Sequence, residues 1–222
     1  MRIAFFGGSF DPPHRGHLAI ARAAIQRLAL DQVWMAPVGA QPLKLDGYTT
    51  SFEDRLAMVE LAITADPAIV ASAIDAPRND GKPNFTIDVL AAIKDSLPPD
   101  DTLFFLLGAD AFLSLKQWRG AARLPFLCDF IVAGRPGFSM EDVRATLPSG
   151  ISAEPSDDGL PGIVTWLLRN DNGEQSRLYL MPNLQENISA THIRAALAGE
   201  ESEEGVLSPA VLRYIRERGL YR

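Results

Sequence analysis

Cysteine is almost absent from this chain of 222 residues, in which Cys128 stands alone. A single cysteine excludes an internal disulfide framework and any zinc site built on several thiolates. Long apolar runs are missing too, so the sequence predicts no membrane-spanning helix. The first residues, MRIAFFGG, are broken by glycine too early for a signal peptide. These absences predict a cytoplasmic globular protein.

Basic residues are also in short supply. The chain has 21 Lys and Arg against 28 Asp and Glu, a formal net charge of -7. This balance argues against a nucleic-acid-binding protein, because affinity for a phosphate backbone depends on clustered Lys and Arg. An acidic protein that binds an anionic ligand must concentrate its positive groups locally. The hydrophobic fraction of 47% is ample for a full core and shows no signature of disorder.

Short apolar runs alternate with amphipathic stretches along most of the chain. Predicted strands cover 3–6, 32–36, 69–74, 102–107 and 129–133, and predicted helices cover about 14–28, 51–65 and 85–96, with shorter ones after Asp110 and Ser139. Alternation of this kind is typical of a parallel sheet with helices on both faces. We therefore expect an α/β protein with a Rossmann-like, doubly wound parallel sheet, in which residues 1–222 form a single domain.

The stretch 146–176 interrupts this pattern with several prolines, glycines and aspartates. It contains a possible hairpin that runs from 163–168 through Asn172-Gly173 to 177–181. We interpret it as an excursion from the main domain. Two helices are predicted to close the chain, one after Ser189 and one from Ser208-Pro209 to Gly219.

The first predicted strand leads directly into a glycine-rich turn, GGSFDPPHRGH, over residues 7–17. Ligands of open α/β sheets bind at the carboxyl ends of the strands, so this turn is the first candidate site. Gly7 and Gly8 would let the backbone approach a phosphate, and the following helix would direct its positive end there. The turn matches neither G-x-G-x-x-G nor G-x-x-x-x-G-K-[ST], which makes a dinucleotide-dependent dehydrogenase or a P-loop hydrolase less favoured.

His14 and His17 are the most informative residues of this turn. Their spacing on a first helical turn directs both imidazoles toward one volume, where they suit a polyphosphate whose leaving group gains charge. Two alternatives remain open: ordinary surface histidines, or metal ligation together with Asp11 in a D-x-x-H-x-x-H pattern.

A second phosphate-binding candidate lies late in the chain, in the run ISATHIR at residues 188–194. Ser189 is a plausible helix N-cap and Thr191 adds a hydroxyl in the first turn. The guanidinium of Arg194 could reach a phosphate bound at that helix N-terminus. An ordinary capped helix with a surface arginine is the alternative, but two such N-termini could converge on one triphosphate.

Together the two segments resemble the nucleotidyltransferase superfamily marked by G-x-F-x-P-x-H-x-G-H and I-S-x-T-x-x-R motifs. Within it, the whole chain except 146–176 looks like the bacterial nicotinate mononucleotide adenylyltransferases. Three further matches are a G-x-D pattern at 108–110 with Trp118 downstream, an R-P-G pattern at 135–137, and a C-terminal Y-I…G-L-Y pattern from 214 to 221. The resemblance implies transfer of an adenylyl group from ATP to nicotinate mononucleotide, with release of pyrophosphate, in NAD biosynthesis.

The resemblance also implies roles for individual residues. Gly8, Ser9 and Phe10 would cradle the ATP phosphates with the two catalytic histidines, His17 lying nearest the α-phosphate and His14 beside it. The β- and γ-phosphates would be held by Ser189, Thr191 and the catalytic Arg194. The remaining implied contacts are Gly108 and Asp110 at the adenosine ribose, Arg135 at a phosphate or the adenine, Lys44 and Thr86 at the mononucleotide, and Trp118 stacked on its pyridine ring.

Two positions depart from the family pattern. The usual S-Y-T before the third helix is Asn84-Phe85-Thr86, which removes a hydroxyl, and the P-P-H-K-like run is Gln41-Pro42-Leu43-Lys44, which keeps a cation. Some implied roles also have structural alternatives. Asp110 could be a helix N-cap, Trp118 could pack in the core against Leu115 and Phe126, and Arg135 could form a surface salt bridge. Arg55, Met58 and Leu61 are expected on a core-facing helix surface.

The expected mechanism is direct in-line attack of the mononucleotide 5′-phosphate on the α-phosphorus of ATP, with Mg²⁺ carried on the ATP phosphates and no resident metal. ATP and nicotinate mononucleotide are the expected partners, without nucleic acid or membrane. Three alternatives are kept: the same chemistry with nicotinamide mononucleotide as acceptor, a metal-dependent nucleotide hydrolase using Asp11, His14 and His17, and a nucleotide-sensing module without catalysis.

Overall fold

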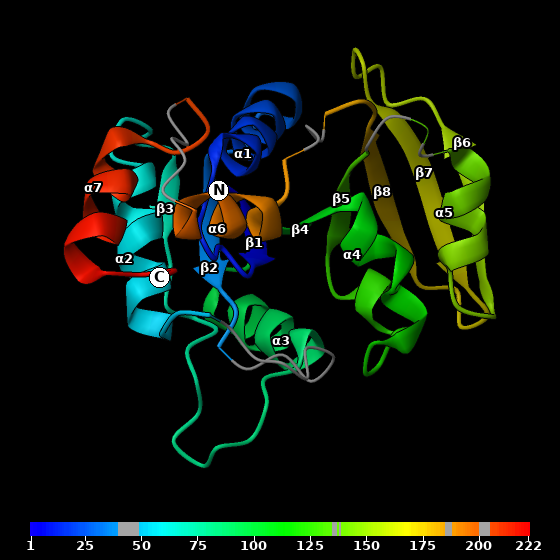
Figure 1. The fold of residues 1–222 in the computed structure, drawn as a ribbon. Helices are drawn as coiled ribbons and strands as arrows, with labels where there is room; N and C mark the ends of the chain where they lie inside the picture. The colour runs from blue at the N-terminus through cyan, green and yellow to red at the C-terminus, as the bar shows by residue number, and fades with distance from the viewer. Residues whose placement is uncertain (40–48, 135–136, 138, 185–187, 200–204) are drawn as a thin grey trace.

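The computed structural model describes residues 1–39, 49–134, 137, 139–184, 188–199 and 205–222. These residues form one eight-stranded sheet with helices on both faces (Figure 1). The strands are β1 Arg2–Gly8, β2 Gln32–Pro37, β3 Ile69–Ala71, β4 Thr102–Gly108, β5 Asp129–Ala133, β6 Ile151–Ser156, β7 Val164–Asn170 and β8 Gln175–Met181. The helices are α1 Arg15–Leu28, α2 Phe52–Ala62, α3 Thr86–Ser96, α4 Ala109–Leu113, α5 Met140–Thr146, α6 Ala190–Ala198 and α7 Pro209–Arg218, with short 3₁₀ turns at Leu115–Gln117 and Leu124–Phe126.

The strand order is β3-β2-β1-β4-β5-β8-β7-β6. In this order, neighbouring strands from β3 through β8 pair in parallel. The pairs β8·β7 and β7·β6 at the far edge are antiparallel. The order reverses between β1 and β4, which is the switch point where such sheets bind ligands. The prediction of a Rossmann-like, doubly wound α/β fold is confirmed.

Two apolar layers cover the two faces of the sheet because alternate strand residues point to opposite sides. On one face Phe5, Phe105 and Phe130 pack beneath α3 and α4, with the Phe5 and Phe105 rings 5.8 Å apart. On the other, Phe6 and Phe104 pack beneath α1. Both layers leave the carboxyl ends of β1 and β4 open to the loops that follow them. No helix in the described ranges is long and apolar enough to cross a bilayer.

The stretch 146–176 adds to the same sheet. The suggested hairpin corresponds to β7 and β8, and β6, which the sequence pattern did not reveal, pairs with β7 at the sheet edge. Trp166 of β7 is fully buried, and the Arg144 guanidinium of α5 lies 5.3 Å from the centre of its ring. This antiparallel extension lies far from β1 (Figure 1).

Several predicted boundaries were wrong by one to three residues. Residues His14 and Phe85 are N-caps with extended backbone, so α1 and α3 each begin one residue later than predicted. The α2 helix ends at Ala62, and β3 ends at Ala71, which leaves Ile74 45% exposed in the following loop. The predicted cap Ser208 and the stop at Gly219 are confirmed, and Ser51 and Ser139 are the N-caps of α2 and α5.

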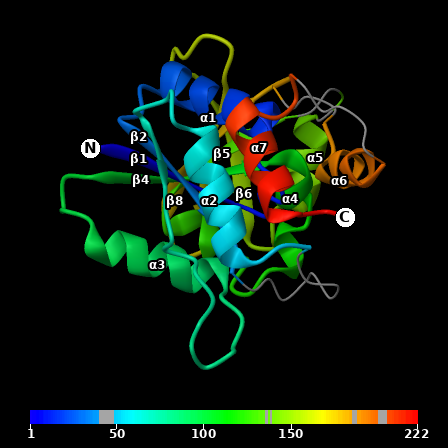
Figure 2. The same ribbon diagram turned by 60° about the vertical axis from the view of Figure 1, so that its left-hand side comes forward.

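Helix α7 packs along α2, as both ribbon views show (Figure 2). The junction centres on Asp54, which accepts hydrogen bonds from Ser51, from the Tyr214 hydroxyl at 2.9 Å and from Arg218 at 3.1 Å. Burial opposes ionisation of Asp54, but these donors lower its pKa. The carboxylate therefore joins the start of α2 to the C-terminal helix.

A second carboxylate, Asp11, joins the C-terminal tail to the glycine-rich turn. Asp11 is 1% exposed, and its Oδ1 accepts from the Tyr221 hydroxyl at 2.7 Å and from Thr50 Oγ1 at 2.7 Å. The Thr49 amide donates to Oδ2 at 2.9 Å. Burial and the Asp11 carboxylate raise the pKa of Tyr221, which keeps this hydroxyl a donor.

Replacing Tyr221 by Phe should therefore destabilise the protein. A buried hydrogen bond to a charged group contributes roughly 1.5–3 kcal/mol, and Asp11 retains two other donors, so a loss of about 1–2 kcal/mol is expected. Urea unfolding followed by circular dichroism measures it. Tyr214→Phe is the matched control, because its hydroxyl bonds to Asp54 at a partly exposed position and should cost less. Equal losses in the two variants would contradict a special role for the Asp11 contact.

Candidate active site

The glycine-rich turn begins at the carboxyl end of β1, where Gly7 and Gly8 are the last strand residues. A Cβ on Gly8 would lie 2.8 Å from the Phe10 ring, so glycine is required there by close packing. Phe10 has a positive φ of 46°, a conformation that costs a residue with a side chain roughly 1–2 kcal/mol. Burial of its ring against Phe6 and His17 offsets this cost and fixes the turn.

His14 and His17 form a stacked pair at the start of α1. Their ring centroids are 3.7 Å apart, although His14 is the N-cap and not a residue of the first turn. The His14 backbone N–H donates to His17 Nδ1 at 3.2 Å. A neutral His17 ring that accepts at Nδ1 carries its proton on Nε2 and can donate from there. A Cβ on Gly16 would lie 3.1 Å from His14 Nδ1, a tight contact that would push the His14 ring.

The electrostatics keep His17 neutral. Burial, followed by repulsion from His14, lowers the pKa of His17 well below its ordinary value of 6.5. The ring is thus uncharged at pH 7 and acts as a hydrogen-bond donor with fixed orientation. Positive potential in this turn comes instead from the N-terminal end of α1.

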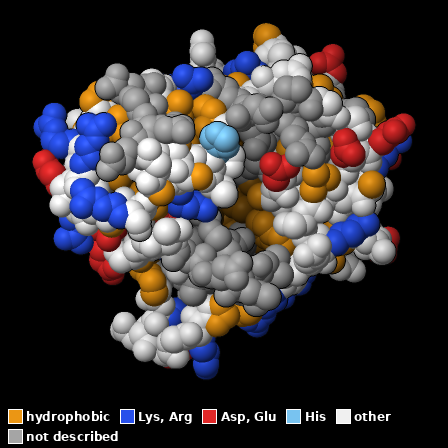
Figure 3. All heavy atoms as spheres, in the orientation of Figure 1, with side chains coloured by type: hydrophobic (Ala, Val, Ile, Leu, Met, Phe, Trp, Pro, Cys, Tyr) orange, Lys and Arg blue, Asp and Glu red, His pale blue; other side chains and the backbone are white. Residues whose placement is uncertain are grey.

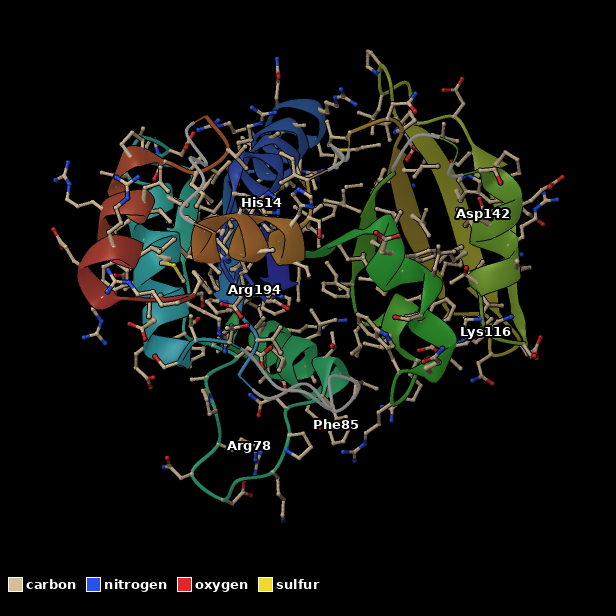
Figure 4. All side chains as sticks on the ribbon, in the orientation of Figure 1. His14, Arg78, Phe85, Lys116, Asp142 and Arg194 are labelled. Carbon is tan, nitrogen blue, oxygen red and sulfur yellow. The ribbon has the colours of Figure 1, made fainter. Side chains whose placement is uncertain are left out.

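The second predicted segment reaches the same turn. Arg194 of α6 donates from Nη1 to the Asp11 carbonyl at 2.8 Å and from Nη2 to Thr191 Oγ1 at 3.2 Å. Ser189 is the N-cap position of α6, but its side chain makes no capping hydrogen bond, contrary to the expected cap. The first N–H groups of α6 are therefore not satisfied by this hydroxyl. Figure 4 shows Arg194 on α6 close to the start of α1.

The carboxylate of Asp11 is committed to Tyr221, Thr50 and Thr49, as described above. Among the described residues there is no group of three His, Cys, Asp or Glu side chains arranged to hold a metal ion. The proposed ligand set of Asp11, His14 and His17 does not assemble, which removes the geometric basis of the hydrolase alternative.

A cavity of about 250 Å³ opens beside the turn. It is visible as an orange-walled hollow near the centre of Figure 3. Residues of the glycine-rich turn form one side, and Thr86 and Trp118, which were predicted to contact the mononucleotide, form the other. Its described lining includes Gly7, Gly8, Ser9, Phe5, Phe105, Asn84, Phe85, Thr86, Asp75, Trp118 and Arg119.

Trp118 forms an aromatic wall of this cavity. Its indole Nε1 donates to Ser114 Oγ at 2.8 Å, and its ring lies 6.1 Å from that of Phe105. The side chain is partly buried against the core and also faces the cavity. Trp118 therefore packs against the core, as the structural alternative had it, and also presents a ring surface to the cavity.

Asn84 and Asp75 hold the loop opposite. The Asn84 amide donates to Asp75 Oδ1 at 2.8 Å and to the Ala76 carbonyl at 2.8 Å, while the Gly39 amide donates to the Asp75 carbonyl at 2.9 Å. Burial raises the pKa of Asp75 to about 6, against the effects of Asn84 and Arg55. This network fixes Phe85 and Thr86 at the start of α3.

Of the other predicted residues, Gly108 and Asp110 are described by the structure and two are not. Gly108 ends β4 at the switch point and is the N-cap of α4, so the suggestion that Asp110 caps this helix was wrong. Asp110 is exposed on the first turn of α4. Lys44 and Arg135 lie outside the described residues.

Three polar residues of this region were missed or misjudged. Arg55, expected on a core-facing surface with Met58, is 1% exposed and donates from Nη1 to the Ser9 carbonyl at 3.0 Å. A cation in an apolar helix face was the signal that could have revealed this contact. Asp75 and Arg119 lie in loop sequence with no periodic pattern, so only the folded chain brings them to the cavity.

Comparison with known proteins agrees with this geometry. Residues 5–196 match the cytidylyltransferase-like family. Two relatives, from Chromobacterium violaceum and Desulfatibacillum aliphaticivorans, are each named a probable nicotinate-nucleotide adenylyltransferase. Both are 35% identical to this chain over its full length, covering 99% and 100% of the relatives.

Solved structures agree in fold. A nicotinic acid mononucleotide adenylyltransferase of Plasmodium falciparum, complexed with NaAD, superposes with a TM-score of 0.72 at 20% identity, covering 99% of this chain and 97% of that one. These matches confirm the resemblance that the two phosphate-binding motifs suggested. The chain belongs to the cytidylyltransferase-like family and, within it, to the nicotinate-nucleotide adenylyltransferases.

Proposed function

We propose that this protein, with residues 1–222 as one nucleotidyltransferase domain, transfers the adenylyl group of ATP to nicotinate mononucleotide and releases pyrophosphate. The product is nicotinate adenine dinucleotide, an intermediate of NAD biosynthesis, made in the cytoplasm. The observation that carries the proposal is the hydrogen bond from Arg194 to the Asp11 carbonyl. It joins the N-terminal regions of α1 and α6 at the switch point, where one polyphosphate can contact both.

In this proposal the turn after β1 binds the ATP phosphates. Backbone groups of Gly8, Ser9 and Phe10 cradle them, with His14 and His17 alongside and His17 nearest the α-phosphorus. The β- and γ-phosphates lie at the N-terminus of α6 with Ser189, Thr191 and Arg194. The Ser189 hydroxyl, which makes no capping hydrogen bond to α6, and the Thr191 contact of Arg194 support this assignment.

The remaining contacts extend from this centre. Gly108 and Asp110 lie at the carboxyl end of β4, where the adenosine ribose is placed, with Arg135 assigned to a phosphate or the adenine. The cavity beside Gly8 holds the mononucleotide, with Thr86 near its pyridine substituent and Trp118 stacked on the ring. Lys44 is assigned to its phosphate.

The acceptor phosphate is already anionic at neutral pH, so in-line attack needs no protein nucleophile. Catalysis then consists of alignment and of stabilising charge on the transferring and leaving phosphates. A neutral His17, which accepts a hydrogen bond at Nδ1, donates from Nε2 to an α-phosphate oxygen. Arg194 neutralises charge that grows on pyrophosphate.

In this proposal the divalent cation arrives with ATP. We propose Mg²⁺, held by the triphosphate bound at Ser9, Thr191 and Arg194. When bound, such an ion screens the phosphate charges and favours departure of pyrophosphate.

The proposal is tested by offering the protein ATP and Mg²⁺ with either nicotinate or nicotinamide mononucleotide, and identifying dinucleotide products by chromatography. We expect rapid formation of the acid dinucleotide and a strong preference over the amide. Equal rates would favour the amide-accepting alternative. ATP binding without any dinucleotide would overturn the proposal in favour of a nucleotide-sensing module.

His17→Ala should lower kcat by about 100-fold or more, because a positioned donor to a reacting oxygen commonly contributes that much. Steady-state pyrophosphate release measures the effect, with circular dichroism to verify folding. His192→Ala is the matched control, since His192 is exposed on α6. Near-normal turnover of a folded His17→Ala enzyme would contradict the assigned role.

Removing divalent ions should abolish activity, and adding Mg²⁺ should restore it fully, because the ion is expected to exchange with each ATP. The measurement is pyrophosphate release before and after chelation. A transition metal that survives dialysis, with activity that Mg²⁺ fails to restore, would instead support a metal-dependent hydrolase.

A further inference from the structure

Two charged side chains are present among the described residues that line the cavity, Asp75 and Arg119. The other described walls are mainly aromatic or uncharged, with Phe105 and Trp118 supplying ring surfaces. A charged group on a ring bound in the cavity could be recognised by either of these side chains, so the contacts that each one makes decide which is available.

Asp75 is turned into the protein. It is 6% exposed, and its carboxylate accepts from Asn84 at 2.8 Å. Its backbone carbonyl accepts from Gly39 at 2.9 Å. The group has a structural task in holding the loop before α3, and it adds no positive potential to the cavity.

Arg119 is placed differently. Its guanidinium carbon lies over the Phe85 ring, 4.5 Å from the ring centre, which is within cation–π distance. Its contact with Asp88 Oδ2 is long, at 3.5 Å, and the side chain is 60% exposed. A guanidinium over an aromatic face still has N–H groups that can bind a carboxylate.

The backbone adds potential of the same sign. Arg119 lies over Phe85, the N-cap of α3, and the Phe85 side chain makes no capping hydrogen bond. Thr86, the first residue of this eleven-residue helix, also lines the cavity. An anion next to Phe85 would thus meet both the positive end of α3 and the guanidinium.

We propose that Arg119, stacked on Phe85, selects the acid form of the pyridine mononucleotide by binding the carboxylate on its ring. This deepens the proposed function, on which it rests. Acid and amide differ in that one carries a negative charge on the ring substituent. Arg119 therefore stabilises the acid and gains little from the amide, whereas the aromatic walls hold either ring.

The test compares kcat/KM for nicotinate and nicotinamide mononucleotide in Arg119→Gln. Loss of one charge-assisted hydrogen bond should lower the value for the acid by about tenfold or more and leave that for the amide within about twofold. KM for ATP should not change. Arg119→Lys, which keeps the charge and loses the planar stack, should retain an intermediate preference.

Lys116→Gln is the matched control. It removes a positive charge three residues away, but Lys116 donates to the Ala145 carbonyl and lies toward α5 (Figure 4). Its selectivity should equal that of the wild type. Equal losses for acid and amide in Arg119→Gln, or unchanged selectivity, would overturn the proposal. Failure of the wild-type protein to adenylylate either mononucleotide would instead refute the proposed function itself.

Discussion

The buried Asp11 residue is the contact on which the rest of the site depends. Its carboxylate binds Tyr221, Thr50 and the Thr49 amide, and its carbonyl binds Arg194. A carboxyl group at 1% exposure is tolerated only when hydrogen-bond donors surround it, and these donors come from three distant parts of the chain. The glycine-rich turn is therefore held by the C-terminus and α6 as much as by its own sequence.

This arrangement explains how a protein with a net charge of -7 can receive a polyphosphate. Positive potential is local: it comes from the N-terminal ends of α1 and α6, from Arg194, and from Arg55 beneath the Ser9 carbonyl. His17 contributes a donor and not a charge, because burial lowers its pKa. Of the acidic residues, Asp11 at the site is occupied by Tyr221 and Thr50, and others, such as Asp54 at the α2–α7 junction, lie elsewhere.

The order of strands and helices could be predicted because buried parallel strands are apolar runs and the helix caps are local signals. The pairing of His14 with His17 and the position of Arg194 followed from motif spacing. The features that could not be predicted are those that depend on tertiary contacts. β6 carries Pro155 and an exposed face, so its pattern did not indicate a strand, and Arg119 acquires its place only when Phe85 packs beneath it. The partner of Arg55, the Ser9 carbonyl, is likewise brought to it only by tertiary packing.

The central claim is that two helix N-termini align ATP for a single in-line displacement without a protein nucleophile. Its most direct test is the stereochemical course at the α-phosphorus, using ATP made chiral there with sulfur or oxygen isotopes. One in-line attack inverts the configuration, and inversion is the predicted result. Retention would contradict the account, because it requires a second displacement through an adenylylated side chain.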